Sequence, residues 1–278
     1  MKKESLKMSK NLIWLASYPK SGNTWVRAII NSALTNNENI NNLSSLTKEF
    51  SNLVDNSSMQ STLKDDDVLA QGTLWAPLQR RISFELGKKE LFVKTHNAAI
   101  KFNNEQFPIE NVTSRVVYIV RDPRDVAVSY AHHFNQSLDE AIKNITSERN
   151  YISDLVTKNR FQYLSSWNIH VKTWSSLKVK RLIIRYEDLH LSPQKEVKKL
   201  LDFLNINPMI SINDIIKNTS FNNLKRFEKE NGFKEAVNNK KFFRTGKIGD
   251  YKNHKNDGFK LIEKNFQKLW LNIIIFKF

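Results

Sequence analysis

Hydrophobic residues along the chain follow two spacings: short apolar runs that are typical of buried strands, and three-to-four-residue repeats that are typical of helices. The runs predict strands over 11–17, 91–95, 116–120 and 181–185. The run at 116–120 is rich in β-branched residues, which favour extended backbone. A polar stretch over 36–61 predicts a loop or a loosely packed helix.

Helical spacing follows most of the predicted strands. Apolar residues recur on one face from Trp25 to Leu34, and Asp122 caps a helix that Pro123 opens and that runs to about Phe134. Three later helices are predicted: one whose face carries Phe161, Leu164, Trp167, Val171 and Trp174, one that starts at Ser192-Pro193, and a C-terminal one over 258–273.

Strands separated by helices predict an α/β fold, with a central and mostly parallel sheet flanked by helices on both faces. The 278 residues contain no internal repeat and no clear linker, so we expect a single domain over 1–278 with its core at about 11–253. In such a sheet ligands bind beyond the carboxyl ends of the strands. Polar clusters that directly follow predicted strands are therefore the candidate site.

Composition narrows the chemistry. With 44 Lys and Arg against 28 Asp and Glu, the formal net charge is +16, which favours a nucleic acid, a membrane surface or a phosphorylated small molecule as partner. The absence of cysteine excludes disulfides, thiolate zinc sites and a cysteine nucleophile. The seven glycines fit neither a Rossmann fingerprint nor a standard Walker A loop nor a nucleophile elbow. A polar N-terminus and short apolar runs predict a cytoplasmic protein without a transmembrane segment.

The segment 18–25, YPKSGNTW, lies between a predicted strand and a predicted helix. Backbone N–H groups at a helix start bind phosphate-like anions, and the side chains of Lys20, Ser21 and Thr24 would add donors. Trp25 could stack on a base. A capped strand-to-helix turn has the same features, but here the lysine precedes the glycine, whereas it follows the glycine in a Walker A loop.

Three more clusters follow strands. Arg121 ends one strand, and Ser129 lies about two turns into the next helix, so both could bind one phosphate. His96 follows the strand that carries Lys94, and a histidine at that edge suits general-base chemistry on a hydroxyl. Tyr186 follows the last strand, in the run RYEDL. The neighbouring Arg124, Asp125, Glu187 and Asp188 fit surface ion pairs or helix-start acids equally well.

These segments together resemble the sulfotransferases that use 3′-phosphoadenosine 5′-phosphosulfate (PAPS). YPKSGNTW is similar to their 5′-phosphosulfate loop, YPKSGTTW, with Asn23 as the one departure, and we expect its amide to remain a donor. Arg121 and Ser129 keep the spacing of the family's 3′-phosphate site, and VKTH over 93–96 resembles its catalytic strand end. The run 244–253, RTGKIGDYKN, resembles RKGxxGDWKN, with Thr245 in place of the lysine.

The resemblance implies a P-loop-like nucleotide-binding architecture and PAPS as co-substrate. We expect no metal, because the sulfuryl group carries less charge than a phosphoryl group and the sequence has no metal-ligand constellation. His96 would be the general base, Lys20 would stabilise the bridging oxygen, and Lys94 would line the acceptor site with His96. The implied donor-binding residues are Lys20, Ser21, Gly22, Asn23, Thr24, Trp25, Arg121, Ser129, Tyr186, Thr219, Ser220, Phe221, Phe243, Arg244, Thr245 and Gly246. The loss of the lysine at 245 would lower the affinity for the donor.

The acceptor is not encoded in these motifs. A small molecule or a saccharide with a hydroxyl or amine fits, and we expect 36–67 and 72–90 to supply its contacts, because acceptor-binding residues lie on variable loops. Two other functions stay open from the residues alone, and both are disfavoured. A basic nucleic-acid-binding protein is disfavoured because the sequence has no RNP, KH or zinc-finger pattern and its basic residues are spread widely. A nucleotide kinase with a degenerate phosphate loop is disfavoured because the lysine precedes the glycine. The excess charge also leaves contact with an anionic surface open, and the oligomeric state is not predicted.

Overall fold

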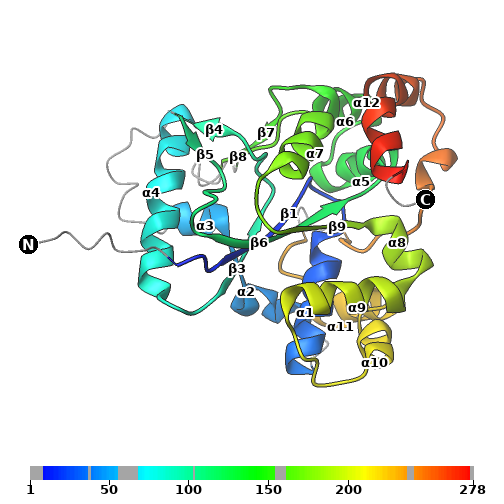
Figure 1. Ribbon diagram of the computed structural model, residues 1–278. Helices are drawn as coiled ribbons and strands as arrows, with labels where there is room; N and C mark the ends of the chain where they lie inside the picture. The colour runs from blue at the N-terminus through cyan, green and yellow to red at the C-terminus, as the bar shows by residue number, and fades with distance from the viewer. Residues whose placement is uncertain are drawn as a thin grey trace, which may run out of the picture.

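A computed structural model describes residues 9–36, 39–55, 68–102, 104–153, 161–236 and 241–275. Its centre is a five-stranded sheet with strand order β2-β3-β1-β6-β9, and every neighbouring pair is parallel (Figure 1). The strands are β1 (Leu12–Ser17), β2 (Thr47–Glu49), β3 (Leu91–Thr95), β6 (Thr113–Val120) and β9 (Arg181–Arg185). The predicted α/β class and parallel sheet are confirmed.

Helices cover both faces of the sheet, as Figure 1 shows. The alternation of side chains along β1 divides the core, because Trp14 faces one cluster of buried residues and Ile13 the other. The Trp14 face is covered by α3 (Phe50–Asp55), α4 (Val68–Leu86), α5 (Pro123–Phe134), α6 (Leu138–Thr146), α7 (Trp167–Ser176) and α12 (Gly258–Ile275). The Ile13 face is covered by α1 (Asn23–Thr35), α8 (Tyr186–Leu191), α9 (Pro193–Leu204) and α10 (Ile212–Asn218).

The polar stretch 36–61 is largely helical where the structure describes it, as one of the two predicted alternatives had it. The predicted loose packing is wrong there, because Ile40, Leu43 and Phe50 are buried in the core. The stretch forms a short 3₁₀ turn (Ile40–Asn42), α2 (Leu43–Leu46), the edge strand β2 and α3. β2 is only three residues long and gains its order by pairing with β3, with Glu49 opposite Lys94. Residues 37–38 and 56–61 lie outside the described part of the chain.

The helix predicted from Phe161 onward begins later. Residues 162–163 form β8 (Gln162–Tyr163), which pairs with β7 (Tyr151–Ile152), and a second hairpin joins β4 (Lys101–Phe102) to β5 (Glu105–Gln106). Ser165 has a left-handed φ of 58°, and the hydroxyl of Ser166 accepts a hydrogen bond from the Ile169 amide as the N-cap of α7. Phe161 and Leu164 are buried in the core although they precede the helix. Their three-residue spacing therefore looks helical in the sequence without being so.

The topology brings the polar clusters to one edge. β1, β3, β6 and β9 are parallel, so the residues that follow them meet beyond their carboxyl ends. The remaining elements, α11 (Phe221–Asn231) and a 3₁₀ turn over Asp250–Asn253, complete the part of the fold beside this edge. Within the described ranges no helix is both long and apolar enough to cross a bilayer.

Candidate active site

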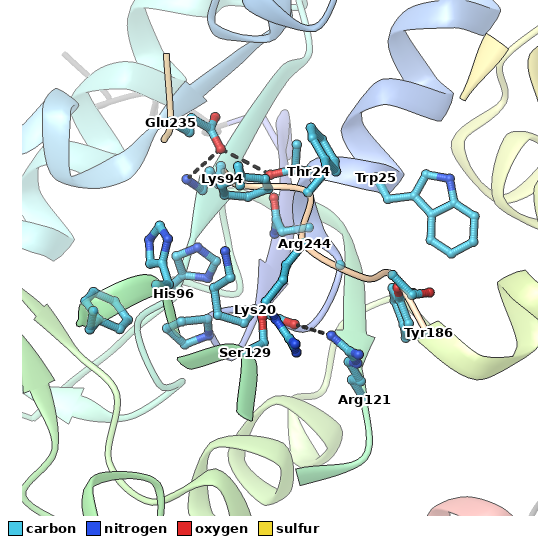
Figure 2. A pocket seen from close by; sticks show the side chains of 18 of the residues that line it. Lys20, Thr24, Trp25, Lys94, His96, Arg121, Ser129, Tyr186, Glu235 and Arg244 are labelled. Atoms are coloured by element: carbon cyan, nitrogen blue, oxygen red, sulfur yellow. Dashed lines mark hydrogen bonds and ion pairs between the residues drawn. The ribbon is translucent and has the colours of Figure 1, made fainter. Parts of the chain in front are cut away.

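A cavity of about 640 Å³ lies at the carboxyl edge of the sheet (Figure 2). It is lined by most of the residues that the sequence singled out: Lys20, Gly22, Asn23, Thr24, Trp25, Lys94, His96, Arg121, Ser129, Tyr186, Phe221, Phe243, Arg244, Thr245 and Gly246. Ser21, Thr219 and Ser220 are not among its lining residues. One cavity therefore joins the candidate nucleotide-binding groups to the candidate base.

The loop before α1 presents backbone amides to the cavity as well as the Lys20 side chain. Gly22 is the N-cap of α1 with a φ of 106° and supplies no side-chain cap, so the first amides of the helix are available to an anion. A Cβ on Gly22 would lie 2.8 Å from Cδ2 of Tyr186. Glycine is required here both by the left-handed backbone and by the close approach of this ring.

Two of the expected side-chain donors of this loop, those of Asn23 and Thr24, are engaged elsewhere. The Asn23 amide donates to the carbonyl of Leu15 at 3.0 Å and to Oγ of Ser17 at 3.3 Å, so it faces the sheet and is not the free donor that the sequence suggested. The Thr24 hydroxyl donates to Glu235 at 3.1 Å, whereas Oγ of Ser21 is buried without a hydrogen-bond partner. Lys20 is the charged side chain of this loop that lies in the cavity and remains for an anion.

The Lys20 ammonium lies in the cavity, 3.7 Å from the ring centroid of Phe242. The pKa of Lys20 is lowered to about 7, chiefly by burial and in part by the positive charges of Lys94 and Arg121, while Glu235 opposes the shift. An anion bound beside Lys20 would restore its positive charge, because an opposite charge favours the protonated amine.

The His96 ring is held in one tautomer. Its Nδ1 lies 2.8 Å from the backbone carbonyl of Ser17, which can only accept, so Nδ1 carries the proton and Nε2 has a free lone pair. Burial lowers the pKa of His96 well below its usual value, and the nearby Lys94 charge adds to this. The imidazole is therefore neutral at pH 7 and able to accept a proton at Nε2.

A buried network behind His96 had no signal in the sequence analysis. Tyr118 lies on β6, and its hydroxyl donates to Nδ1 of His170 at 2.9 Å; Nε2 of His170 donates to the backbone carbonyl of His96 at 3.0 Å. Burial lowers the pKa of His170 to about 3, so this ring is also neutral. The two bonds fix the backbone at the candidate base.

Arg121 is positioned by carbonyls on both sides. Nη1 donates to the carbonyl of Lys20 at 3.3 Å and Nη2 to that of Lys247 at 3.0 Å, while the guanidinium lies 4.2 Å from the ring centroid of Tyr186. Its Nε is buried without a hydrogen-bond partner. Ser129 lines the same cavity, as the spacing predicted, although the structure gives no contact between the two side chains.

Aromatic rings surround the end of the cavity near Arg121. Trp25 lies edge-on to Tyr186 with centroids 5.5 Å apart, and His190 lies 4.6 Å from Trp25 and 4.8 Å from Tyr186. Phe221 adds a further ring to the lining. This arrangement of flat apolar surfaces suits a purine base.

Thr219 and Ser220 serve the fold beside this end. The Thr219 hydroxyl donates to the carbonyl of Ile215, and Ser220 is the N-cap of α11. Their side chains therefore do not reach the cavity as the resemblance implied, because both are used to end one helix and start the next. By starting α11, Ser220 positions the first residue of that helix, Phe221, which does line the cavity.

The segment 242–251 is anchored by hydrogen bonds to the Asp125 side chain. This carboxylate is buried and accepts from the amides of Gly249 at 2.8 Å and Tyr251 at 3.0 Å, so the surface-pair interpretation of Asp125 is wrong. Arg244 pairs with Asp250, and the hydroxyl of Tyr186 donates to the carbonyl of Gly246 at 3.1 Å. These contacts hold 244–246 over the cavity.

The other carboxylates of the clusters are also structural. Glu187 is buried and accepts from the Asp122 amide at 2.8 Å, while Asp188 pairs with Arg185 at 3.3 Å. Arg124 pairs with both Asp122 and Glu263 at 2.7 Å. These interactions fix the strand ends of β6 and β9 rather than contribute to the lining.

Glu235 is the most prominent lining residue that sequence reasoning missed. It accepts from Thr24 at 3.1 Å and pairs with Arg27 at 2.7 Å and with Lys94 at 3.9 Å (Figure 2). Burial alone would raise its pKa, but the positive charges of Lys94 and Arg27 lower it to about 2. A lone glutamate in a polar stretch carries no motif, so only the folded chain reveals it.

The acceptor loops were predicted only in part. Glu49 and Ser51, within 36–67, line the cavity. None of the residues 72–90 does, because they form the greater part of α4 and the turn after it, and α4 packs its buried residues into the core. Residues 56–67 lie outside the described ranges.

Comparison with known proteins identifies the family. The model of the sulfotransferase domain family matches residues 10–268. Flavonol 3-sulfotransferase of Flaveria bidentis is 28% identical over 286 residues, covering 95% of this chain and 82% of that protein. Sulfotransferase 1B1 of Canis lupus familiaris is 29% identical over 267 residues, covering 91% and 82%.

Two solved structures share the fold. A mouse sulfotransferase complexed with PAP has a TM-score of 0.57 at 19% identity, covering 95% of this chain and 84% of its own. Retinol dehydratase in complex with androsterone and the inactive cofactor PAP has a TM-score of 0.60 at 18% identity, covering 95% and 81%. With the family model spanning nearly the whole described chain, this protein belongs to the sulfotransferase domain family.

Proposed function

We propose that this protein transfers a sulfuryl group from PAPS to a hydroxyl of a small-molecule acceptor, with His96 as the general base. The observation that carries the proposal is the fixed tautomer of His96, whose Nε2 lone pair is free in the same cavity as Lys20 and Arg121. Family membership supports sulfuryl transfer, and two structures of the same fold were solved with PAP.

The residues fit the nucleotide by several independent features. Arg121 keeps a buried Nε without a partner, and the α1 amides at Gly22 have no side-chain cap. Gly246 has a φ of 62°, and a Cβ there would lie 2.2 Å from Phe221, so glycine is required where this backbone packs against the Phe221 ring of the lining. We assign the 5′-phosphosulfate to Lys20 and the α1 amides, the 3′-phosphate to Arg121, Ser129 and 244–246, and the base to the aromatic rings.

PAPS, when bound, supplies a sulfuryl group on a phosphosulfate anhydride, which is already activated for transfer. His96 accepts the proton of the acceptor hydroxyl at Nε2 while the Ser17 carbonyl holds Nδ1–H, so the ring does not turn as it becomes charged. Lys20 stabilises the negative charge that develops on the bridging oxygen when its bond to sulfur breaks. The new bond joins sulfur to the acceptor oxygen.

The test is a calorimetric titration with 3′-phosphoadenosine 5′-phosphate (PAP), with 5′-AMP and duplex DNA as comparison ligands. We expect PAP to bind at micromolar concentration or tighter and 5′-AMP much more weakly. Because hydrogen bonds to charged groups contribute about 1.5–3 kcal/mol, R121A should weaken PAP binding by roughly 10- to 150-fold. The exposed Arg81, paired with Glu85 on α4, gives the matched control R81A.

Failure to bind PAP, together with DNA binding that weakens steeply as salt increases, would replace this proposal with a nucleic-acid-binding function.

A further inference from the structure

A carboxylate at the edge of the sheet lies beside the candidate acceptor site. Glu49 is the last residue of β2 and pairs in register with Lys94 of β3, two residues before His96. It lines the same cavity as His96, and its side chain is 29% exposed, so it is neither buried in the core nor fully solvated. An acceptor whose hydroxyl reaches His96 therefore passes close to this carboxylate.

Only one of the two oxygens of the Glu49 carboxylate has partners among the described residues. Lys94 Nζ lies 3.3 Å from Oε1 of Glu49, and the amide of Gln162 donates to the same Oε1 at 3.5 Å. Both contacts are longer than the 2.7–2.9 Å of a strong charge-assisted hydrogen bond. Among the described residues no hydrogen bond or ion pair is recorded to Oε2. An ionised carboxylate accepts at both oxygens, so Glu49 has unused capacity for a donor.

Lys94 does not neutralise Glu49 alone, because its ammonium lies between the carboxylates of Glu49 and Glu235. Glu235 is 3.9 Å from its Nζ on the other side. Glu235 is itself well satisfied, with Arg27 at 2.7 Å and the Thr24 hydroxyl at 3.1 Å. Of the two carboxylates around Lys94, whose side chains are equally exposed at 29%, Glu49 is thus the one with the weaker partners.

The neighbouring walls are mixed in character. Phe134 and Ile152 supply apolar surface, and Ser153 and Gln162 supply polar groups, all within the lining. The apolar part of an acceptor would pack against Phe134 and Ile152. If the acceptor were apolar throughout, it would also remove water from Glu49 without replacing the lost hydrogen bonds, which is costly for a charged group.

We propose that the acceptor carries a second hydrogen-bond donor, best a protonated amine, and that Glu49 binds it while His96 faces the hydroxyl to be sulfated. This inference rests on the proposed function, because it names the substrate class of the same site. A hydroxyl in place of the amine offers the same donor chemistry without the charge, and is bound less tightly.

Three phenols of equal size separate these cases: tyramine ends in an ammonium, tyrosol in a hydroxyl and 4-propylphenol in a methyl group. Their dissociation constants are measured by calorimetry on the PAP-saturated protein, which requires no turnover, and their kcat/KM with PAPS is measured in parallel. We expect tyramine to bind at least tenfold more tightly than 4-propylphenol, with tyrosol between them.

The variant E49Q keeps the shape of the side chain and removes its charge. We expect it to abolish the preference for tyramine and to leave the affinity for 4-propylphenol unchanged or improved. E105Q is the matched control, since Glu105 is an exposed carboxylate paired with Arg80 at 2.7 Å outside the cavity lining. Thermal unfolding of both variants checks that the fold is retained.

Each other outcome overturns the inference. Equal affinity for the three phenols, no binding of any of them, or an equal loss for all three in E49Q would mean that Glu49 only holds Lys94. Those results leave PAP binding intact. Failure of the protein to bind PAP at all is the distinct result that would reject the proposed function instead.

Discussion

The two ends of the cavity are built in different ways. The end assigned to the nucleotide consists of segments that follow β1, β6 and β9 directly, together with 244–246. It relies on backbone amides, two glycines with positive φ and Arg121 held by carbonyls. The end assigned to the acceptor consists of side chains from an edge strand, a short hairpin and the segment after α11, among them Glu49, Gln162 and Glu235.

This difference shows which end of the cavity can change its ligand specificity without a change of fold. Backbone geometry at a strand end needs particular residues, such as glycine where a Cβ would meet Tyr186, so the nucleotide end has little freedom. The acceptor end uses side chains whose replacement leaves the backbone intact. A substitution at one end, or at the base between them, is therefore expected to leave binding at the other end unchanged.

The largest effect is expected from H96A, at the junction of the two ends. General-base catalysis contributes about 10²- to 10⁴-fold, so kcat should fall by that order while PAP binding stays unchanged. Steady-state kinetics and calorimetry measure the two quantities. H132A is the control histidine, outside the cavity lining. An unchanged kcat/KM in H96A would mean that another group accepts the proton.

The next effect is a pH dependence confined to the nucleotide end. Lys20 has a pKa of about 7 in the free protein because it is buried. Bound PAP raises this pKa, so binding takes up a proton above pH 7, and affinity should fall by at most roughly tenfold per pH unit as pH rises.

Titrations at pH 8 in buffers of different ionisation enthalpy measure the proton uptake directly. K20M should remove both the uptake and the pH dependence of the affinity. Uptake that persists in K20M would assign the proton to another group.

A smaller effect is expected behind the base. Y118F removes the hydroxyl that donates to His170 and so loosens the bond from His170 to the His96 carbonyl. One net hydrogen bond contributes about 0.5–1.5 kcal/mol, so kcat should fall by roughly 2- to 12-fold with the KM for PAPS unchanged. Tyr118 and His170 would then be positioning residues.

Y163F is the matched control for that prediction, because the Tyr163 hydroxyl donates to the Glu148 carbonyl at 2.8 Å away from His96. If both variants lose thermal stability and neither changes kcat, the network is purely structural.

The smallest effect is a gain at the nucleotide end. T245K restores the lysine that related loops carry, and the residue lines the cavity. A partly exposed ion pair contributes about 0.3–1 kcal/mol, so PAP should bind roughly two- to fivefold more tightly at low salt. The gain should vanish at high salt, and S176K, on the exposed end of α7, should show none. A loss of affinity would mean that 245 does not face the phosphate.

The sequence by itself determined what depends on local spacing. The strands 91–95 and 181–185 and the helix 123–134 have the predicted bounds, because apolar period, N-cap and proline act within a few residues. The motifs after the strands were placed correctly as well, since a parallel sheet brings its carboxyl ends to one edge.

Tertiary structure decided what depends on partners distant in sequence. The Asn23 amide faces Leu15 and Ser17 because the first turn of α1 packs against β1. Ser51 and Gln162 line the cavity because of strand pairing. Ser51 follows β2, which pairs with β3, and Gln162 lies in β8, which pairs with β7. Thr24 and Glu235 are separated by 211 positions and meet in one hydrogen bond. No local pattern encodes such a contact, since its energy exists only once the chain has folded.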